Sequence, residues 1–470
     1  MGKEKLLVLV PGITGSVLAD PSGREVWGLR PDTALRAVFG EQLRIDRELV
    51  PVGLLPDVRP VPWTTVPGYQ RLTRSIAKRL KLPDGSVHTA RPDRRIDPEA
   101  CLLCVPYDFR RDMCASAEQL GRQIERVRAG REVVVVAHSM GGVVARCWWA
   151  LFGGHRVCRT IATIGSPHRG APKALDLLLN GIWPGRGRAA EIIGKAFEPA
   201  SRTIREWPAL FDLLPRYPAV RTPSGALRPH ELSGTPEWFA RGAAEAFARH
   251  ERLEEACLRL GEQPVRAFYS NGHATPARAE FDGEQLTVER CDAEWLPHES
   301  PWLGGDGTVP AISAAPIGVD EPEQTAANMQ WVRGNHLSLM GASGLLDFLQ
   351  HLWAPGLAAV HGTREERGPW IGLDVEEVLP AQHATTIGLR LHSPEGAPGS
   401  EVPGSWARVL LRRQGASSAE ELAVEQTEPN AWRAQLPALP AGVHRLSFTA
   451  GGGEATDPVQ ESSEIGVVSC

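Results

Sequence analysis

One serine stands where a run of β-branched residues meets a helical pattern. The segment VVVVAHSMGG spans residues 133–142, and Ser139 lies at its turn, flanked two positions away by the small residues Ala137 and Gly141. A tight strand-to-helix turn that exposes a nucleophilic serine requires small residues at these positions. The pattern therefore predicts Ser139 as the nucleophile of an acyl-transfer reaction. The alternative is an ordinary turn whose serine caps the helix.

A serine hydroxyl becomes a good nucleophile only when a base takes its proton. In folds with this turn, the acid and the base follow the serine in the order Asp or Glu, then His. Asp306 lies among glycines in the segment GGDG (304–307), which lets a loop turn sharply around one carboxylate. His336 lies between the strand-like segment 329–332 and a helical pattern that begins at 337. We expect His336 to be the base and Asp306 to orient it.

Other acids and histidines in the chain are rivals for these roles. The acids lie in polar segments that lack the cluster of glycines seen around Asp306, and the histidines follow no suitable strand end: Asp282, Asp292, His273, His298 and His351. His138 is the neighbour of the nucleophile, and we expect it to point away from the site and to pack structurally.

Acyl transfer also needs donors for the oxyanion of the tetrahedral intermediate. One donor is expected to be the backbone N–H of Met140, the residue after the nucleophile. The second is expected from the loop after an early strand, where VPGITGS (10–16) carries two glycines that free the backbone. We assign it to the N–H of Ile13, and the alternative is a simple glycine turn.

Strand and helix patterns alternate through the first 350 residues. This alternation is typical of a parallel sheet covered by helices, and with the nucleophile turn it predicts an α/β-hydrolase fold with a mostly parallel central sheet. The predicted strands are 6–10, 101–105, 132–137, 159–164, 264–269 and 329–332, and the predicted helices are 116–128, 143–152 and 337–352.

Two segments interrupt the alternation, and a third region departs from it. Residues 20–68 and 171–263 are predicted cap insertions over the site, because functional loops lie above a rigid sheet. From about residue 354 the chain changes to short strand-like runs between turns, which predicts a β-sandwich. We therefore expect a catalytic domain over 1–355 and an Ig-like accessory domain over 356–470.

Composition limits the classes of function. Hydrophobic residues make up 42% and charged residues 23% of the 470 positions, as in ordinary globular proteins. The net charge of −5 and the absence of Lys/Arg clusters interleaved with aromatic residues argue against nucleic-acid binding. No apolar run is long enough to span a membrane, and the N-terminal run is too short for a signal peptide, so we expect a cytoplasmic protein. The pair Cys101 and Cys104 lacks a second ligand pair, and we expect neither a metal nor a cofactor.

Taken together, these segments resemble the lecithin:cholesterol acyltransferase family, which includes lysosomal phospholipases and phospholipid:diacylglycerol acyltransferases. The matching segments, in family order, are VPGITGS (10–16), PYDFR (106–110), AHSMGG (137–142), GSPHRGAPKAL (165–175), GDGTVP (305–310) and NHLSLM (335–340). Phe109 stands where the family usually has Trp. No Cys precedes Cys101, so the early loop disulfide of the animal members has no counterpart.

The resemblance implies hydrolysis of lipid acyl esters, or acyl transfer from them, on a transient membrane surface. An apolar acyl site is then expected from cap residues, namely Trp27, Trp183, 177–179, Trp207, Phe211 and Trp238. The alternative, favoured for any single one of them, is that the residue only packs the interior of the caps. One alternative is a small-molecule carboxylesterase or thioesterase. Another, of a different class, is an effector or scaffold regulated by a protein partner or by self-association through the C-terminal region.

Overall fold

The protein is described by a computed structural model. The structure describes residues 5–28, 42–56, 58–61, 64–66, 68–91, 96–182, 198–289, 304–316, 328–353, 369–375, 378–392, 404–452 and 458–468.

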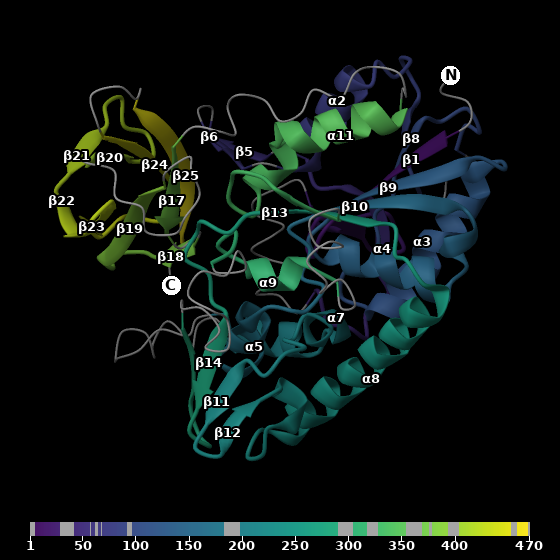
Figure 1. Cartoon of the computed structure of the whole chain (residues 1–470), viewed down its shortest axis with the longest axis horizontal. Coiled ribbons are helices and arrows are strands. Elements are labelled where there is room, and N and C mark those ends of the chain that lie inside the picture. The colour runs from purple at the N-terminus through teal and green to yellow at the C-terminus, as the bar shows by residue number, and fades with distance from the viewer. Residues whose placement is uncertain are drawn as a thin grey trace.

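A seven-stranded sheet forms the centre of the N-terminal region (Figure 1). Every neighbouring pair in it is parallel. In spatial order the strands are β16 (Met329–Trp331), β13 (Val265–Tyr269), β10 (Cys158–Ile164), β9 (Glu132–His138), β1 (Lys5–Val10), β8 (Leu102–Cys104) and β7 (Val87–Thr89).

Helices cover both faces of this sheet because its central strands are apolar on both sides. Along β9, Val133 and Val135 belong to one core and Val134 and Val136 to the other. The first core is closed by α3 (Met113–Arg128), α4 (Met140–Leu151) and α8 (Glu237–Leu260). The second is closed by α2 (Tyr69–Arg79) and α11 (Ser343–Trp353), on the opposite side in Figure 1. The predicted α/β fold is thus confirmed.

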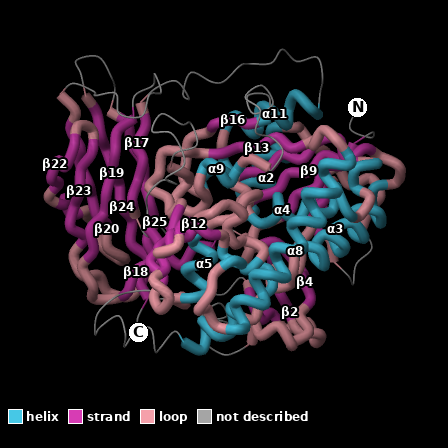
Figure 2. The backbone as a smooth tube through the Cα atoms, turned by 60° about the horizontal axis from the view of Figure 1, so that its bottom comes forward, coloured by secondary structure: helices cyan, strands magenta, loops and turns pink. Residues whose placement is uncertain are grey.

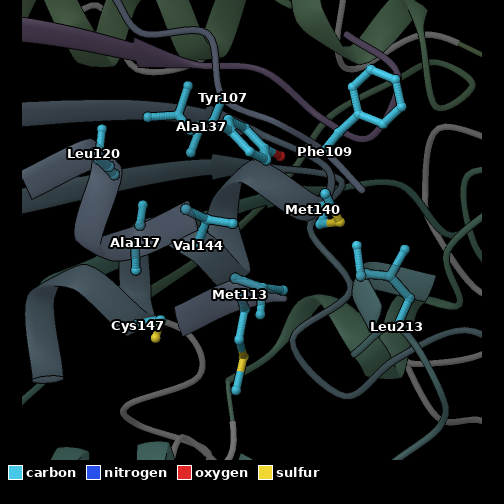
Figure 3. Close-up of a cluster of buried hydrophobic side chains, with 14 of the residues drawn as sticks. Tyr107, Phe109, Met113, Ala117, Leu120, Ala137, Met140, Val144, Cys147 and Leu213 are labelled. Atoms are coloured by element: carbon cyan, nitrogen blue, oxygen red, sulfur yellow. The ribbon is translucent and has the colours of Figure 1, made fainter. Parts of the chain in front are cut away.

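The first core reaches the start of α4 without a break. Figure 3 shows Leu120 and Met113 of α3 facing Val144 of α4, with Met140 near Phe109. All five side chains are essentially buried. Met140 follows Ser139 directly, so this packing fixes the helix that begins at the predicted nucleophile.

The order in which the chain adds strands to the sheet reverses between β1 and β9. The chain leaves β1 through α2 on one face, and it leaves β9 through α4 on the other. Open parallel sheets bind ligands at the carboxyl ends of strands where such a reversal occurs. The loop after β1 and the turn after β9, which carry the predicted oxyanion donors and Ser139, meet at this point.

The predicted insertions contain strands as well as helices. The first carries β2 (Ser16–Ala19), β3 (Glu25–Trp27) and β4 (Val50–Leu54) in one sheet and β5 (Val58–Val61) and β6 (Thr64–Val66) in another. The second contains α5 (Pro172–Leu179), α7 (Pro208–Phe211), α8 and the 3-10 turn η2 (Pro229–Glu231). It also contributes β11 (Val220–Thr222) and β12 (Gly225–Leu227) to a four-stranded sheet with β14 (Arg278–Phe281) and β15 (Leu286–Glu289). The sequences of these short strands lack the alternation of apolar and polar residues from which a strand is predicted.

The remaining short elements of the N-terminal region are α9 (Ala311–Ala314) and the 3-10 turns η1 (Gly154–Arg156) and η3 (Ser338–Gly341).

The C-terminal region contains two sheets that share an apolar core (Figure 2). Antiparallel pairs predominate, and only β18 and β25 run parallel among the described pairs. One sheet contains β17 (Trp370–Asp374), β19 (Thr385–His392), β23 (Ala431–Leu436) and β22 (Val424–Glu428). The other contains β18 (Val378–Pro380), β25 (Val459–Val468), β24 (Gly442–Gly451), β20 (Trp406–Arg412) and β21 (Glu420–Leu422). The predicted sandwich is confirmed, whereas its predicted boundary at 355/356 lies outside the described residues.

Arg110 ties the first insertion to the body of the protein. Its side chain is fully buried and forms a bidentate ion pair with Asp108, with 2.8 Å from Nε to Oδ1 and from Nη2 to Oδ2. The same guanidinium donates to the carbonyl oxygens of Arg44 and of Arg47. Trp207 adds a hydrogen bond from its indole N–H to the Leu43 carbonyl, at 2.9 Å. Polar side chains thus hold residues 43–47 without a disulfide.

We predict that Arg110→Met lowers the free energy of unfolding by about 3 kcal/mol, because it leaves the Asp108 carboxylate and two carbonyl groups without their donor. The measurement is urea unfolding followed by tryptophan fluorescence. Arg122→Met is the control, because Arg122 forms only an exposed ion pair with Glu118 and should change stability by less than about 0.5 kcal/mol. Equal unfolding midpoints for the two variants would contradict the prediction.

Candidate active site

The backbone at Ser139 adopts a conformation that non-glycine residues rarely take, with φ 53° and ψ −130°. The N–H of Ser139 donates to the Ile164 carbonyl at 2.9 Å, which ties the turn to β10. Only small residues fit around it, because a Cβ on Gly141 would stand 2.4 Å from the Pro11 carbonyl oxygen. This close approach accounts for the glycine seen in the sequence two positions after Ser139.

Three side chains predicted from distant parts of the chain meet at this turn. His336 Nε2 lies 3.0 Å from Ser139 Oγ, and His336 Nδ1 lies 2.7 Å from Asp306 Oδ2. Ser139 and His336 are each 8% exposed and Asp306 is 2% exposed. The arrangement is that of a nucleophile, a base and an orienting acid.

The surroundings of Asp306 keep its carboxylate ionised. Burial acts to raise the pKa of Asp306, but the facing His336 and backbone donors outweigh it, and the pKa lies below its usual value. The donors are the N–H groups of Thr308 and Val309, at 3.0 and 2.7 Å from Oδ1. These bonds leave Oδ2 directed at His336, so the loop fixes both the charge and the direction of the carboxylate.

The loop after β1 runs against the nucleophile. A Cβ on Gly12 would stand 2.8 Å from the Cβ of Ser139, so a side chain there would displace one of them. Ile13 follows in this loop, and Met140 is the first residue of α4, whose early N–H groups have no acceptor within the helix. Met140 is therefore adjacent to Ser139 in the chain, and Ile13 directly follows the glycine that packs against it.

The rival groups are placed elsewhere or have other contacts. Asp282 accepts from the N–H groups of Glu284 and Gln285 in an exposed turn, and His351 lies in the last turn of α11. Asp292 and His298 lie outside the described residues. His273, in contrast, is buried beside the Asp306 loop, with which it forms backbone bridges.

His138 contacts the site more closely than we expected. Its Nε2 lies 3.2 Å from the His336 carbonyl oxygen, and its Nδ1 lies 2.8 Å from Tyr69 Oη, which accepts from the Gly12 N–H at 2.7 Å. Burial lowers the pKa of His138 to about 3, helped by the neighbouring His336, so the ring is neutral. When the neutral ring donates a hydrogen bond from Nε2 to the His336 carbonyl, its Nδ1 accepts a hydrogen bond from the Tyr69 hydroxyl. A hydrogen-bond chain thus joins the backbone of the predicted base to the loop after β1.

Sequence reasoning did not assign Tyr69 or Gly165 to the site. Gly165 has φ +53°, and a Cβ there would stand 2.7 Å from Asp306 Oδ2 and 3.0 Å from His336 Nδ1. Gly165 directly follows β10, which is the neighbour of β9, the strand that leads to Ser139. A glycine at the end of this strand is the sequence feature that could have indicated its place in the site. Tyr69 carried no such signal, because only the fold brings α2 to His138.

Aromatic side chains of the insertions gather near this edge of the sheet. Phe109 contacts Trp27 and Trp207 edge to face, with ring centroids 5.9 and 5.6 Å apart. Phe211 lies edge to face with Trp238 at 6.3 Å, and residues 177–179 are buried or partly buried on α5. Trp183, also predicted for an acyl site, lies outside the described residues.

Among the described residues, no group of three or more His, Cys, Asp or Glu side chains is arranged to hold a metal ion. No described helix is long and apolar enough to cross a membrane.

Comparisons with known proteins support the fold class. The PGAP1-like alpha/beta domain matches residues 115–183, which contain the Ser139 turn. Among curated proteins, no sequence matches this chain significantly. The crystal structure of the Tle4-Tli4 complex contains a similar chain, with 15% identity over 74% of this chain and 97% of that chain and a TM-score of 0.50.

The chain is less similar to the propeptide form of the Bacillus licheniformis lipase BlEst2. The identity is 10% and the TM-score is 0.35, over 98% of this chain and 93% of that one. The fold is that of an α/β hydrolase. The comparisons do not single out the lecithin:cholesterol acyltransferase family.

We predict that Gly165→Ala lowers kcat/KM for a short-chain ester by about 100-fold, because its methyl group would displace the Asp306–His336 pair by a fraction of an ångström or more. The matched control is Gly153→Ala. Gly153 also has a positive φ, of +80°, but a Cβ there meets nothing within 4 Å. Backbone strain is then similar in both variants, and equal losses of activity would show that the contact with the pair is unimportant.

We predict that Tyr69→Phe lowers kcat about tenfold, because the Gly12 N–H and His138 lose the hydroxyl that joins them. This hydroxyl lies beside the loop after β1 (residues 11–15), which carries the predicted donor Ile13 and is called the oxyanion loop below. Tyr217→Phe is the control, since its buried hydroxyl bonds to the Ala277 carbonyl at 2.9 Å, apart from the Ser139 turn. Each variant should lose about 1–3 kcal/mol of unfolding free energy. Ester hydrolysis and urea unfolding are measured together, and a similar kcat for both variants would contradict the proposed link.

Proposed function

We propose that the protein is a serine-dependent lipid acyl-ester hydrolase that acts through an acyl-enzyme intermediate. The observation that carries the proposal is the chain of contacts from Asp306 through His336 to Ser139, at 2.7 and 3.0 Å. These are the distances at which a base can take a hydroxyl proton and an acid can orient that base.

The reaction follows from the positions of these groups. His336 Nε2 accepts the proton of Ser139 as Oγ attacks the ester carbonyl carbon, and Asp306 stabilises the resulting imidazolium. The N–H groups of Met140 and Ile13 donate to the oxyanion. His336 then protonates the leaving alcohol, and water or an acceptor alcohol releases the acyl group by the reverse sequence.

The preference for lipids rests on the family resemblance and on the insertions. The ordered set of segments from VPGITGS to NHLSLM resembles lipid-processing acyltransferases and phospholipases. The Trp27 indole donates to the Thr14 carbonyl in the loop after β1 at 2.9 Å, and Trp27 packs with Phe109, which contacts Trp207, so an apolar aromatic cluster stands beside that loop. These features favour a lipid acyl ester over a polar ester.

A carboxylesterase or thioesterase for small molecules is the second candidate. It is favoured by the low exposure of Ser139 and His336, 8% each, because such a site admits a small ester more easily than a lipid in a bilayer.

The domain division and a protein partner belong to the same proposal. Residues 1–355 would form the catalytic domain and residues 356–470 an accessory domain, as the two separate apolar cores suggest. The similar chain in the Tle4-Tli4 complex was solved as a complex. By analogy, we infer that the present chain also has a protein partner that regulates it.

The test is fatty-acid release from mixed phospholipid liposomes and hydrolysis of a short-chain soluble ester by the wild type and Ser139→Ala. We expect the wild type to act on liposomes and the variant to lose at least about 10³-fold in rate, because the nucleophile is gone. Ser166→Ala is the control, since this neighbouring buried serine is not in the triad.

Hydrolysis of the soluble ester alone would favour the second candidate. Undiminished turnover in Ser139→Ala would refute the proposed mechanism.

A further inference from the structure

The C-terminal sandwich contacts the loop that follows β13. Strand β17 is at the edge of its sheet and is paired only with β19 in the described order. An edge strand has N–H groups that point out of its sheet and need acceptors when they are buried. The N–H of Leu373 donates to Nδ1 of His273 at 3.1 Å, so a side chain of the α/β region satisfies it.

The position of β17 against this loop is fixed by a close aromatic contact. A Cβ on Gly272 would stand only 1.1 Å from the Cη2 atom of Trp370, so only glycine permits the approach. The Trp370 ring stacks on His392 of β19, with centroids 4.1 Å apart, and meets Trp331 edge to face at 5.6 Å. Trp331 is the last residue of β16, the strand that leads to His336.

His273 is bound on its other side to the loop that carries Asp306. Its N–H donates to the Gly305 carbonyl at 2.9 Å. Its own carbonyl accepts from the Thr275 hydroxyl at 2.8 Å, and that hydroxyl accepts from the Gly307 N–H at 2.9 Å. The residues on both sides of Asp306 are therefore bonded to the segment 273–275.

The imidazole of His273 is a neutral acceptor in this position. The residue is 5% exposed, and burial lowers its pKa against the raising effect of the Asp306 carboxylate. A neutral ring keeps a lone pair on Nδ1 for the Leu373 N–H. His273 thus joins an edge strand of the sandwich to the Asp306 loop, through its side-chain bond with Leu373, its backbone bond with Gly305 and the Thr275 hydroxyl that it shares with Gly307.

We propose that the C-terminal sandwich is a positioning element of the active site, which acts through His273 to hold the Asp306 loop in its productive geometry. The inference rests on the proposed function, because it assigns Asp306 the role of orienting His336. His273 is a positioning residue and takes no part in the chemistry. Its effect requires the sandwich to be docked, so displacement of β17 would lower the activity without altering any residue of the triad.

The test measures the rate at which a fluorophosphonate probe labels Ser139 in the full chain. This rate reports activation of the serine and does not depend on knowing the natural substrate. His273→Leu removes the acceptor at Nδ1, and His273→Asn keeps an acceptor oxygen at the same distance from the backbone. We expect labelling about 30-fold slower in His273→Leu and within about threefold of the wild type in His273→Asn, because small displacements of an orienting group cost one to two orders of magnitude.

A second pair of variants approaches the contact from the sandwich side. Trp370→Ala removes the ring that lies on Gly272, and we expect labelling about tenfold slower. Trp406→Ala is the matched control, because this tryptophan of β20 is 44% exposed, and its labelling rate should equal that of the wild type. Both proteins are checked for folding by circular dichroism, which keeps the comparison valid if one is less stable.

A pH profile separates positioning from a general loss of structure. If the Asp306 loop shifts, the His336 imidazolium loses part of the stabilisation that the Asp306 carboxylate gives it, and the pKa of His336 falls. Because the neutral imidazole activates Ser139, the decline of the labelling rate at acid pH then moves to lower pH in His273→Leu. A purely structural role would lower the amplitude and leave the limb in place.

The possible failures can be told apart. Wild-type protein that the probe does not label would overturn the proposed function and this inference with it. If the wild type is labelled rapidly and all four variants are labelled at the wild-type rate, this inference alone is overturned. The same holds if His273→Leu and His273→Asn lose the same fraction of the labelling rate.

Discussion

The geometry of the site depends on a backbone conformation that serine rarely adopts. At Ser139 the chain turns from β9 into α4 with a positive φ, which costs free energy that the surroundings must supply. The two apolar cores hold the strand and the helix on either side of the turn, and the Ile164 carbonyl accepts its N–H. The approach of the loop after β1 then requires glycine at positions 12 and 141. Rigid packing therefore makes the strained turn possible and leaves the Oγ within reach of His336.

The other members of the site are held mainly by backbone groups. Asp306 is fixed by two N–H donors of its own loop, and this loop is bonded to the segment that contains His273. The carbonyl of His336 contacts His138, which is joined through Tyr69 to the oxyanion loop. Two buried neutral histidines, His138 and His273, thus lie beside the candidate triad and contact the backbone that carries it.

The sandwich adds a second layer of support outside the hydrolase fold. It has its own core and two sheets, yet its edge strand β17 uses an acceptor from the α/β region. An exposed edge strand is prone to pair with other chains, and covering it against the body removes that hazard. The contact that protects the edge also touches the loops of the acid and the base, because β13 and β16 end at this side of the central sheet.

The sequence by itself determined the fold class and the identities of the candidate triad. The β-branched run before Ser139, the glycines around Asp306 and the strand before His336 each carry a local signal, because strand ends and sharp turns restrict residue types. Only the tertiary structure decided the distances within the candidate triad and the places of Tyr69, Gly165 and His273 beside it. These places arise from contacts between segments remote in the chain, such as α2 with His138 and β17 with the loop after β13. Such contacts leave no periodicity or spacing in the sequence, because the packing of the sheet, and not local propensity, brings the segments together.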